Sequence, residues 1–336
     1  MILNADLGSE HSYLIEYYNH CKSGEYIAGR ELMMQLELLI HDYLDRECIL
    51  ELADAHKRIK FIEEKCKHFE APFAGKPFIL LLWQKAVVEA LYGIKVFDDE
   101  LNRYRRKHKR LTLLIGRKNG KTPFAAALAL AEYFCGNMGT KILCASNDYE
   151  QADICFQAIN NMREESPALE RVTRKNIRGI FFGNPKQKKK RGKFTVQNKG
   201  NIRKLSARSG AKEGRNVAFA IADEVHEMAD NSLIMPVEQS LSTQDEPIFI
   251  EITTEGIIND GYLDEDLAEA RQVLRGELDR PDWLIWLYTQ DSESEIWQDE
   301  QSWYKSNRSL GVVKKWSYLR GMLEKAKISG SDRSFV

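Results

Sequence analysis

The feature that most constrains the fold is a short apolar run, residues 111–115, followed at once by the loop 116–122, Gly-Arg-Lys-Asn-Gly-Lys-Thr. An alanine- and leucine-rich stretch, residues 122–134, follows the loop and reads as a helix. A strand, such a loop and a helix in this order are the context that a phosphate-binding loop requires. The sequence therefore predicts a phosphate-binding loop at residues 116–122.

The end of this loop carries the groups that a phosphate chain needs. Gly120, Lys121 and Thr122 provide inward backbone N–H groups, a lysine for the β- and γ-phosphate oxygens, and a hydroxyl for Mg²⁺. The loop departs from the usual Walker A pattern, because Ile115 occupies the position of the first glycine and Gly116 comes one residue late. A basic turn without a ligand is the alternative interpretation.

A second apolar run, residues 217–222, ends in Asp223 and Glu224. Near-continuous apolar residues are typical of a buried central strand. A Walker B strand ends in this way: Asp223 would hold Mg²⁺ through its water shell, and Glu224 would polarise the attacking water as general base. Strand ends often carry surface charge, so the interpretation depends on pairing the two acids with the loop at 116–122.

The remaining pattern predicts strands alternating with helices. Residues 10–70 and 78–94 read as helical, and residues 98–110 as a polar, basic segment that leads into the first strand. Further strands are predicted at 141–145, 202–207 and 248–253, and further helices at 149–163 and 234–242. Such alternation implies an α/β fold with a largely parallel sheet.

Four motifs, in order along the chain, resemble those of the large terminase subunit of tailed phages, in its N-terminal ATPase part. They are the segments 82–85, 117–122, 223–228 and 252–256. The later run 303–307, Trp-Tyr-Lys-Ser-Asn, resembles a Trp-x-Lys-x-Asn stretch that follows the motor in this family. The resemblance implies a P-loop NTPase fold of the ASCE/RecA-like class, with a mostly parallel sheet flanked by helices, an N-terminal helical region and a small C-terminal subdomain.

The resemblance also implies a division of the chain. We expect an N-terminal helical region at residues 1–70, the P-loop ATPase domain at 71–275, and a C-terminal linker or lid subdomain at 276–336. In this family a nuclease domain follows the motor. The acids Asp291, Glu293, Glu295 and Asp299 crowd one short polar stretch, whereas a two-metal site needs carboxylates from different elements. We therefore expect a surface linker here and no nuclease activity in this chain.

Roles for individual residues follow from the same resemblance. Lys121 and Thr122 would bind phosphate and Mg²⁺ together with Lys118, Asn119 and Gly120, and Arg117 would contact or sense the γ-phosphate. Gln84 would read the adenine edge; a solvated helix residue is the alternative. Asp223 would support the metal and Glu224 would activate water. Thr253 and Thr254 would couple hydrolysis to DNA movement; a β-rich strand end is the alternative.

Packaging motors of this family act as rings, and the resemblance therefore implies that a neighbouring subunit donates an arginine finger. Arg215, ahead of Arg208, is the candidate, because it lies in a turn-like segment just before the strand 217–222. Such a finger stabilises the charge of the transition state and is worth about 10³–10⁵ in rate. Membership of a solvated basic block is the alternative for Arg215.

Charge is strongly segregated although the formal net charge is only -1. Residues 171–215 hold sixteen Lys or Arg and one acid, whereas residues 223–300 hold twenty-two acids and three arginines. Lysines and arginines contact DNA phosphates without regard to sequence, as a packaging motor would need. A solvated loop, with a hairpin tip at 183–185 and the lysine run 186–193, explains the basic block equally well.

The implied cofactors are ATP and Mg²⁺. The implied partners are double-stranded DNA, the portal protein and procapsid, and the small terminase subunit. We expect a homo-oligomeric ring on the procapsid, and a monomer is the alternative for the domain alone. The apolar runs are too short to cross a membrane, and we expect the host bacterial cytoplasm as location. A helicase-like or defence-related P-loop ATPase and a non-catalytic adaptor are the competing functions.

Overall fold

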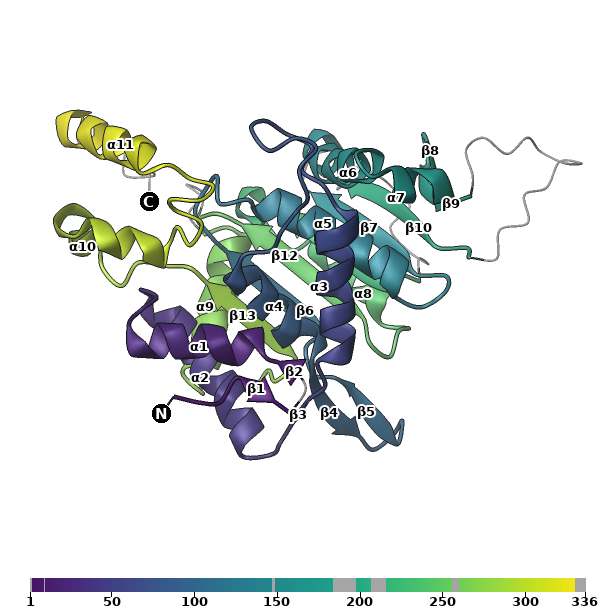
Figure 1. The fold of residues 1–336 in the computed structure, drawn as a ribbon, viewed down its shortest axis with the longest axis horizontal. Coiled ribbons are helices and arrows are strands. Elements are labelled where there is room, and N and C mark those ends of the chain that lie inside the picture. The colour runs from purple at the N-terminus through teal and green to yellow at the C-terminus, as the bar shows by residue number, and fades with distance from the viewer. Residues whose placement is uncertain are drawn as a thin grey trace, which may run out of the picture.

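A sheet of eight strands runs through the centre of the part of the chain that the structure describes (Figure 1). The structure is a computed structural model and describes residues 2–8, 10–146, 149–183, 198–206, 216–255 and 260–329. The strand order is β13-β6-β12-β11-β7-β10-β9-β8. The bounds are β6 (Arg110–Leu114), β7 (Lys141–Ser146), β8 (Thr173–Asn176), β9 (Gly179–Phe182), β10 (Asn201–Ser206), β11 (Phe219–Asp223), β12 (Ile248–Thr253) and β13 (Trp283–Leu287).

Most neighbouring strands of this sheet are parallel. From β13 to β10 every pairing is parallel, and only the hairpin β8–β9 and its junction with β10 are antiparallel. Parallel strands need crossover helices, which must cover both faces of the sheet. The predicted α/β fold with a mostly parallel sheet is confirmed.

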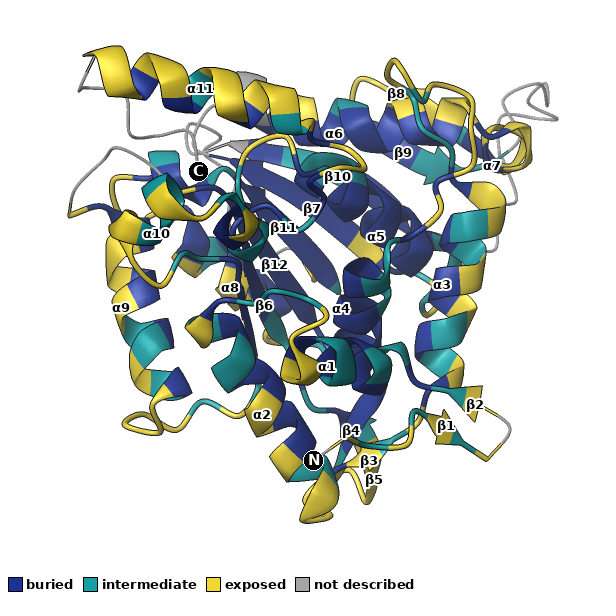
Figure 2. Cartoon of the chain, turned by 60° about the vertical axis from the view of Figure 1, so that its left-hand side comes forward, coloured by how far each residue is buried: buried dark blue, intermediate teal, exposed yellow. Residues whose placement is uncertain are grey.

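The helices divide between the two faces of the sheet. Along β11, Phe219 and Ile221 join a core that includes residues of α1–α6, whereas Ala220 and Ala222 join a second core with α8 and α9. This alternation follows from the period of two in a strand. Figure 2 shows the central strands as buried and the outer helix faces as exposed. The helices are α1 (Tyr13–Ser23), α2 (Arg30–Leu44), α3 (Ala53–Lys65), α4 (Leu82–Tyr92), α5 (Lys121–Cys135), α6 (Tyr149–Glu164), α7 (Pro167–Val172), α8 (Ile234–Leu241) and α9 (Tyr262–Leu274).

Short strands outside the main sheet were not expected from the sequence. Strand β4 (Ile94–Asp98) pairs antiparallel with β3 (Ile49–Leu50) on one side and with β5 (Arg103–Arg106) on the other. Of these strands, β5 lies within the polar segment 98–110, and β3 lies within the segment predicted as helical. A smaller hairpin joins β1 (Asp6–Leu7) and β2 (Glu10–His11). Such strands are too short and too charged to show the alternation that identifies a strand. The predicted helix 78–94 begins only at Leu82, after an extended segment.

Beyond β13 the chain forms a small unit with its own apolar cluster. It contains α10 (Glu293–Gln298), a 3₁₀ helix (Glu300–Lys305) and α11 (Trp316–Ser329). The cluster is made by Trp303, Leu310, Leu319, Leu323 and Ala326. Strand β13 lies in the main sheet although it follows the boundary predicted at residue 275, and the division of the chain stays a prediction. In the described ranges, no helix is both long and apolar enough to cross a membrane.

Candidate active site

The three motif-bearing strands end side by side. Strand β12 lies between β6, which leads into the loop 116–122, and β11, which ends at the acidic pair. The end of β12 is hydrogen-bonded to both neighbours: the Ile115 N–H donates to the Thr253 carbonyl at 3.2 Å, and the Glu224 N–H donates to the Ile252 carbonyl at 2.9 Å. Because these strands are parallel, their carboxyl ends share one edge of the sheet, where α/β proteins place their ligands.

The loop 116–122 has the backbone shape of an anion-binding turn. Lys118 and Gly120 both adopt positive φ, 64° and 85°. Gly120 tolerates this conformation without a steric penalty, whereas Lys118 does not, and strained residues of this kind cluster at functional sites. Helix α5 begins at Lys121, and no side chain caps its N-terminus. The N–H groups of its first turn are therefore available to a phosphate.

Lys121 and Glu224 are brought together from different elements. The Nζ atom of Lys121, which is buried, donates to Oε1 of Glu224 at 2.7 Å. Glu224 follows β11 in a left-handed conformation, with φ of 54°, and its side chain remains about 30% exposed. Burial opposes its ionisation, but His226 and Lys121 outweigh this effect and lower the pKa of Glu224 to about 2. Glu224 is thus an ionised, partly accessible carboxylate.

His226 connects this carboxylate to the end of β12. Its Nδ1 atom lies 3.2 Å from Oε2 of Glu224 and 3.1 Å from the Thr253 hydroxyl oxygen. The Thr253 hydroxyl donates to the Thr254 carbonyl at 2.8 Å, so its oxygen accepts from His226, which assigns the ring proton to Nδ1. The contact with Glu224 is electrostatic, because Oε2 has no well-directed hydrogen bond. No role was predicted for His226; its place two residues after the acidic pair was the available signal.

Asp223 is buried beside this pair. Its Oδ1 atom has no hydrogen-bond partner, and neither has the buried hydroxyl of Thr254 on the neighbouring strand. Burial, reinforced by the charge of Glu224, raises the pKa of Asp223 to about 7. Buried polar atoms without a partner indicate a ligand or an ion that completes the site. A carboxylate and the Thr122 hydroxyl are the oxygen donors that Mg²⁺ prefers, so the residues present fit this ion.

Replacing Asp223 with asparagine is expected to stabilise the protein in the absence of ligands. Because the pKa of Asp223 is raised in the folded protein, ionisation of this carboxyl lowers the free energy of unfolding. Stability is therefore lost as pH rises from about 4 to about 7, and the penalty is constant above that range. Urea unfolding should show a gain of about 2–4 kcal/mol for Asp223→Asn at pH 8, shrinking toward pH 4. The exposed Asp99→Asn serves as control. An equal gain at both pH values would contradict the assignment.

Gln84 lies in the first turn of α4 and is buried rather than solvated. Its Oε1 atom accepts the Leu81 N–H at 2.9 Å, which caps the helix. The neighbouring Trp83 ring stands 5.5 Å from the ring of Phe124, in the first turn of α5. The segment that carries Gln84 therefore packs beside the helix that starts at the phosphate loop.

Comparison with known proteins agrees with this arrangement. A sequence model of the family described as "Terminase large subunit, ATPase domain" matches residues 82–272, which contain all four motifs. The chain belongs to this family. The terminase large subunits of Lactococcus phages p2 and SK1 are 28% and 26% identical to it over 254 residues. The crystal structure of the HK97 bacteriophage large terminase superposes with a TM-score of 0.66 at 23% identity, covering 83% of this chain and 53% of that one.

The matches cover only part of the related proteins. The two Lactococcus alignments cover 75% of this chain but 44% of each relative, so the chain spans less than half the length of these terminase subunits. The structural likeness establishes the fold, and the predicted P-loop class is confirmed. In agreement, β12 separates the loop-bearing β6 from the acidic β11.

The other predicted terminase residues are placed as follows. Arg117 and Lys118 are exposed on the loop, whereas Asn119 is buried and its amide donates to the Gly116 carbonyl at 2.8 Å. Arg215, the runner-up Arg208 and the lysine run 186–193 lie outside the described residues. Part of the basic block is described, and there Lys204 pairs with Asp153 at 2.7 Å.

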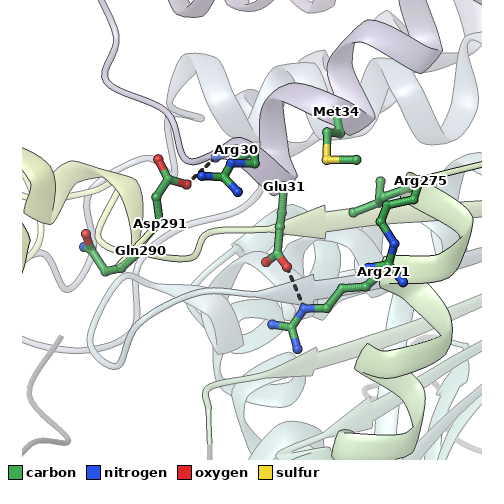
Figure 3. A pocket seen from close by; sticks show the side chains of 8 residues that line it. Arg30, Glu31, Met34, Arg271, Arg275, Gln290 and Asp291 are labelled. Carbon is green, nitrogen blue, oxygen red and sulfur yellow. Dashed lines mark hydrogen bonds and ion pairs between the residues drawn. The ribbon is translucent and has the colours of Figure 1, made fainter. Parts of the chain in front are cut away.

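The acids after β13 take part in local packing. Asp291 accepts the Arg30 N–H at the start of α2 at 2.7 Å, and Lys305 pairs with Asp291 and with Glu295 at 2.8 and 2.5 Å. Figure 3 shows Asp291 beside a pocket between α2 and α9, where Arg271 pairs with Glu31 at 2.6 Å. No residue of the terminase motifs lines this pocket. Within the described ranges, no three His, Cys, Asp or Glu side chains are grouped to hold a metal ion.

Proposed function

We propose that this chain is the ATP-hydrolysing motor of a phage or prophage DNA-packaging machine. The observation that supports this best is the convergence of Lys121, Glu224 and Thr253 at one edge of the sheet, linked through His226. The family of the chain is a second support. Packaging itself belongs to whole terminase subunits, and it is here a proposal.

In this proposal the loop 116–122 binds ATP. Lys121 and the first-turn N–H groups of α5 hold the β- and γ-phosphates, Arg117 contacts the γ-phosphate, and Gln84 lies at the adenine end. Mg²⁺, when bound, neutralises negative charge on the phosphate oxygens. Thr122 and Asp223 are the residues that would hold it.

Glu224 orients and deprotonates the attacking water. Its low pKa makes it a weak base, so its contribution comes from position and from the negative charge beside the water. Thr253 and Thr254 would couple hydrolysis to DNA movement, because the Thr253 carbonyl and hydroxyl contact both the strand of the phosphate loop and the His226 ring. A change in the position of Glu224 would thereby reach β12.

We propose double-stranded DNA, the portal protein, the procapsid and the small terminase subunit as partners. ATP turnover by the purified chain, measured with and without double-stranded DNA, tests the nucleic-acid part. Stimulation by double-stranded DNA supports a packaging motor. Stimulation by single-stranded DNA alone would favour a helicase-like ATPase, and absence of any turnover would favour a non-catalytic adaptor.

Arg215 is proposed as the arginine finger that one subunit donates to its neighbour. Mixing Arg215→Ala protein with Lys121→Ala protein should partly restore turnover, because a mixed ring contains interfaces with an intact Lys121 and an intact Arg215 donor. The assay is ATP turnover under conditions where mixed rings form and wild-type rings are active. Absence of any recovery would place Arg215 in its own subunit's site or outside catalysis.

A further inference from the structure

A C-terminal segment, residues 306–314, is folded around the phosphate loop. The Gly116 N–H donates to the Ser306 carbonyl at 2.9 Å, at the start of the loop. Farther along, the Ser309 N–H donates to Oδ1 of Asn119, and the Ser309 hydroxyl donates to the Asn119 carbonyl, both at 3.0 Å. Side chains and backbone separated by 190 positions in sequence thus fix the loop. No role was predicted for the run 303–307, and its Ser306 contacts the loop directly.

Asn307 is the centre of these contacts. It is fully buried, and its Oδ1 atom accepts from the Asn119 amide at 3.0 Å and from Lys314 Nζ at 2.5 Å. Its own amide donates to the Ser306 hydroxyl at 3.0 Å and to the Trp303 carbonyl at 3.3 Å. Both ends of the side chain are therefore engaged. Alanine would take from Lys314 Nζ the acceptor it has here and would leave the Asn119 amide with backbone acceptors of its own loop only.

The close fit also explains why the loop begins with glycine. A Cβ atom on Gly116 would lie 2.7 Å from Oδ1 of Asn307 and 3.0 Å from the Ser306 carbonyl oxygen. Any larger residue would push the segment away from the loop. Gly116, the irregularly placed first glycine of the motif, thus leaves the space that the Asn307 side chain occupies.

Lys314 adds a buried positive charge to this contact. Its side chain is almost inaccessible, and burial lowers its pKa to about 8. Among the described residues no carboxylate lies within ion-pair distance of it. A desolvated ammonium held by an amide oxygen is stable only while that acceptor stays in place. Lys314 therefore depends on Asn307 remaining against the loop.

We propose that Asn307 is a positioning residue that holds the phosphate loop in its binding shape, so that nucleotide affinity depends on the segment 306–314. This inference rests on the proposed function, since it concerns the same nucleotide site. Linkage requires the converse effect: a nucleotide that stabilises the loop also stabilises the packing of the segment. The start of α11 packs beside this segment, since the ring centroids of Trp316 and Trp303 lie 5.8 Å apart. Helix α11 itself lies on the outside of the molecule (Figure 2).

Substitutions at Asn307 separate this role from a general structural one. In Asn307→Ala, titration with a fluorescent ATP analogue should show affinity reduced about tenfold or more, while turnover at saturating ATP falls much less. Asn307→Asp keeps an acceptor for Asn119 and Lys314 and should stay within about threefold of wild-type affinity. Asn160→Ala is the matched control: Asn160 is a buried asparagine on α6 that binds Arg163, and its loss should lower stability without changing affinity.

Three outcomes distinguish the possibilities. Wild-type affinity in a folded Asn307→Ala protein would overturn the inference. Absence of nucleotide binding by the wild-type chain would instead overturn the proposed function. If Asn307→Ala does not fold, hydrogen exchange of the wild-type chain decides: the ATP analogue should slow exchange at residues 306–314 together with the loop, and protection of the loop alone would overturn the inference.

Discussion

Replacing Lys121 with alanine is expected to abolish detectable ATP binding. The ammonium group of Lys121 is buried at the start of α5 and lies 2.7 Å from one carboxylate oxygen of Glu224, whose other oxygen faces His226 at 3.2 Å. Its removal takes a buried positive charge away from the proposed position of the β- and γ-phosphates, in a site of low dielectric where charge interactions are strong. Titration with a fluorescent ATP analogue measures the loss.

A matched control is available on α3. Lys60 is exposed and pairs with Glu64 on the same helix at 3.8 Å, so Lys60→Ala removes a positive charge without touching the loop. Its ATP affinity should equal that of wild type. Unchanged affinity in Lys121→Ala would show that residues 116–122 do not form the nucleotide site.

Replacing Glu224 with glutamine is expected to separate binding from catalysis. The amide preserves the shape of the side chain but removes the negative charge that Lys121 and His226 hold in place. ATP should still bind, and turnover at saturating ATP should fall by roughly 10²–10⁴. Both quantities are measured on one preparation, by titration and by phosphate release.

The neighbouring acid provides the contrast. Glu227→Gln changes a carboxylate of the short 3₁₀ helix Val225–Glu227, which directly follows Glu224. The Glu227 carboxylate lies 3.8 Å from His226 Nε2, and its replacement should leave turnover close to wild type. A result in which Asp223→Asn abolished turnover while Glu224→Gln had no effect would require the two roles to be exchanged.

Much of this site was predictable because its parts are local in sequence. The strand before the loop, the loop itself and the strand that ends at Asp223 each carry their signal within a few residues. Register then brings them together, since parallel strands in one sheet end at the same edge. The order along the sheet, with β12 between β6 and β11, also follows from the class of fold.

The contacts that the sequence did not reveal are those between distant segments. Nothing local indicates that Asn307 would reach Asn119, or that Asp291 would cap α2, because such partners are chosen by tertiary packing. The buried state of Gln84 was missed for the same reason: helical periodicity does not say which neighbour covers a polar residue. Short charged strands such as β5 escaped because they lack an apolar face.

The most direct test of the central proposal is steady-state ATP turnover by the purified wild-type chain with Mg²⁺, double-stranded DNA and empty procapsids, set against Glu224→Gln under the same conditions. We expect turnover that depends on Mg²⁺, rises when DNA and procapsids are both present, and falls to roughly 10⁻² or less of wild type in the variant. Turnover by the wild-type chain no greater than that of Glu224→Gln, under conditions where the chain binds the procapsid, would contradict it.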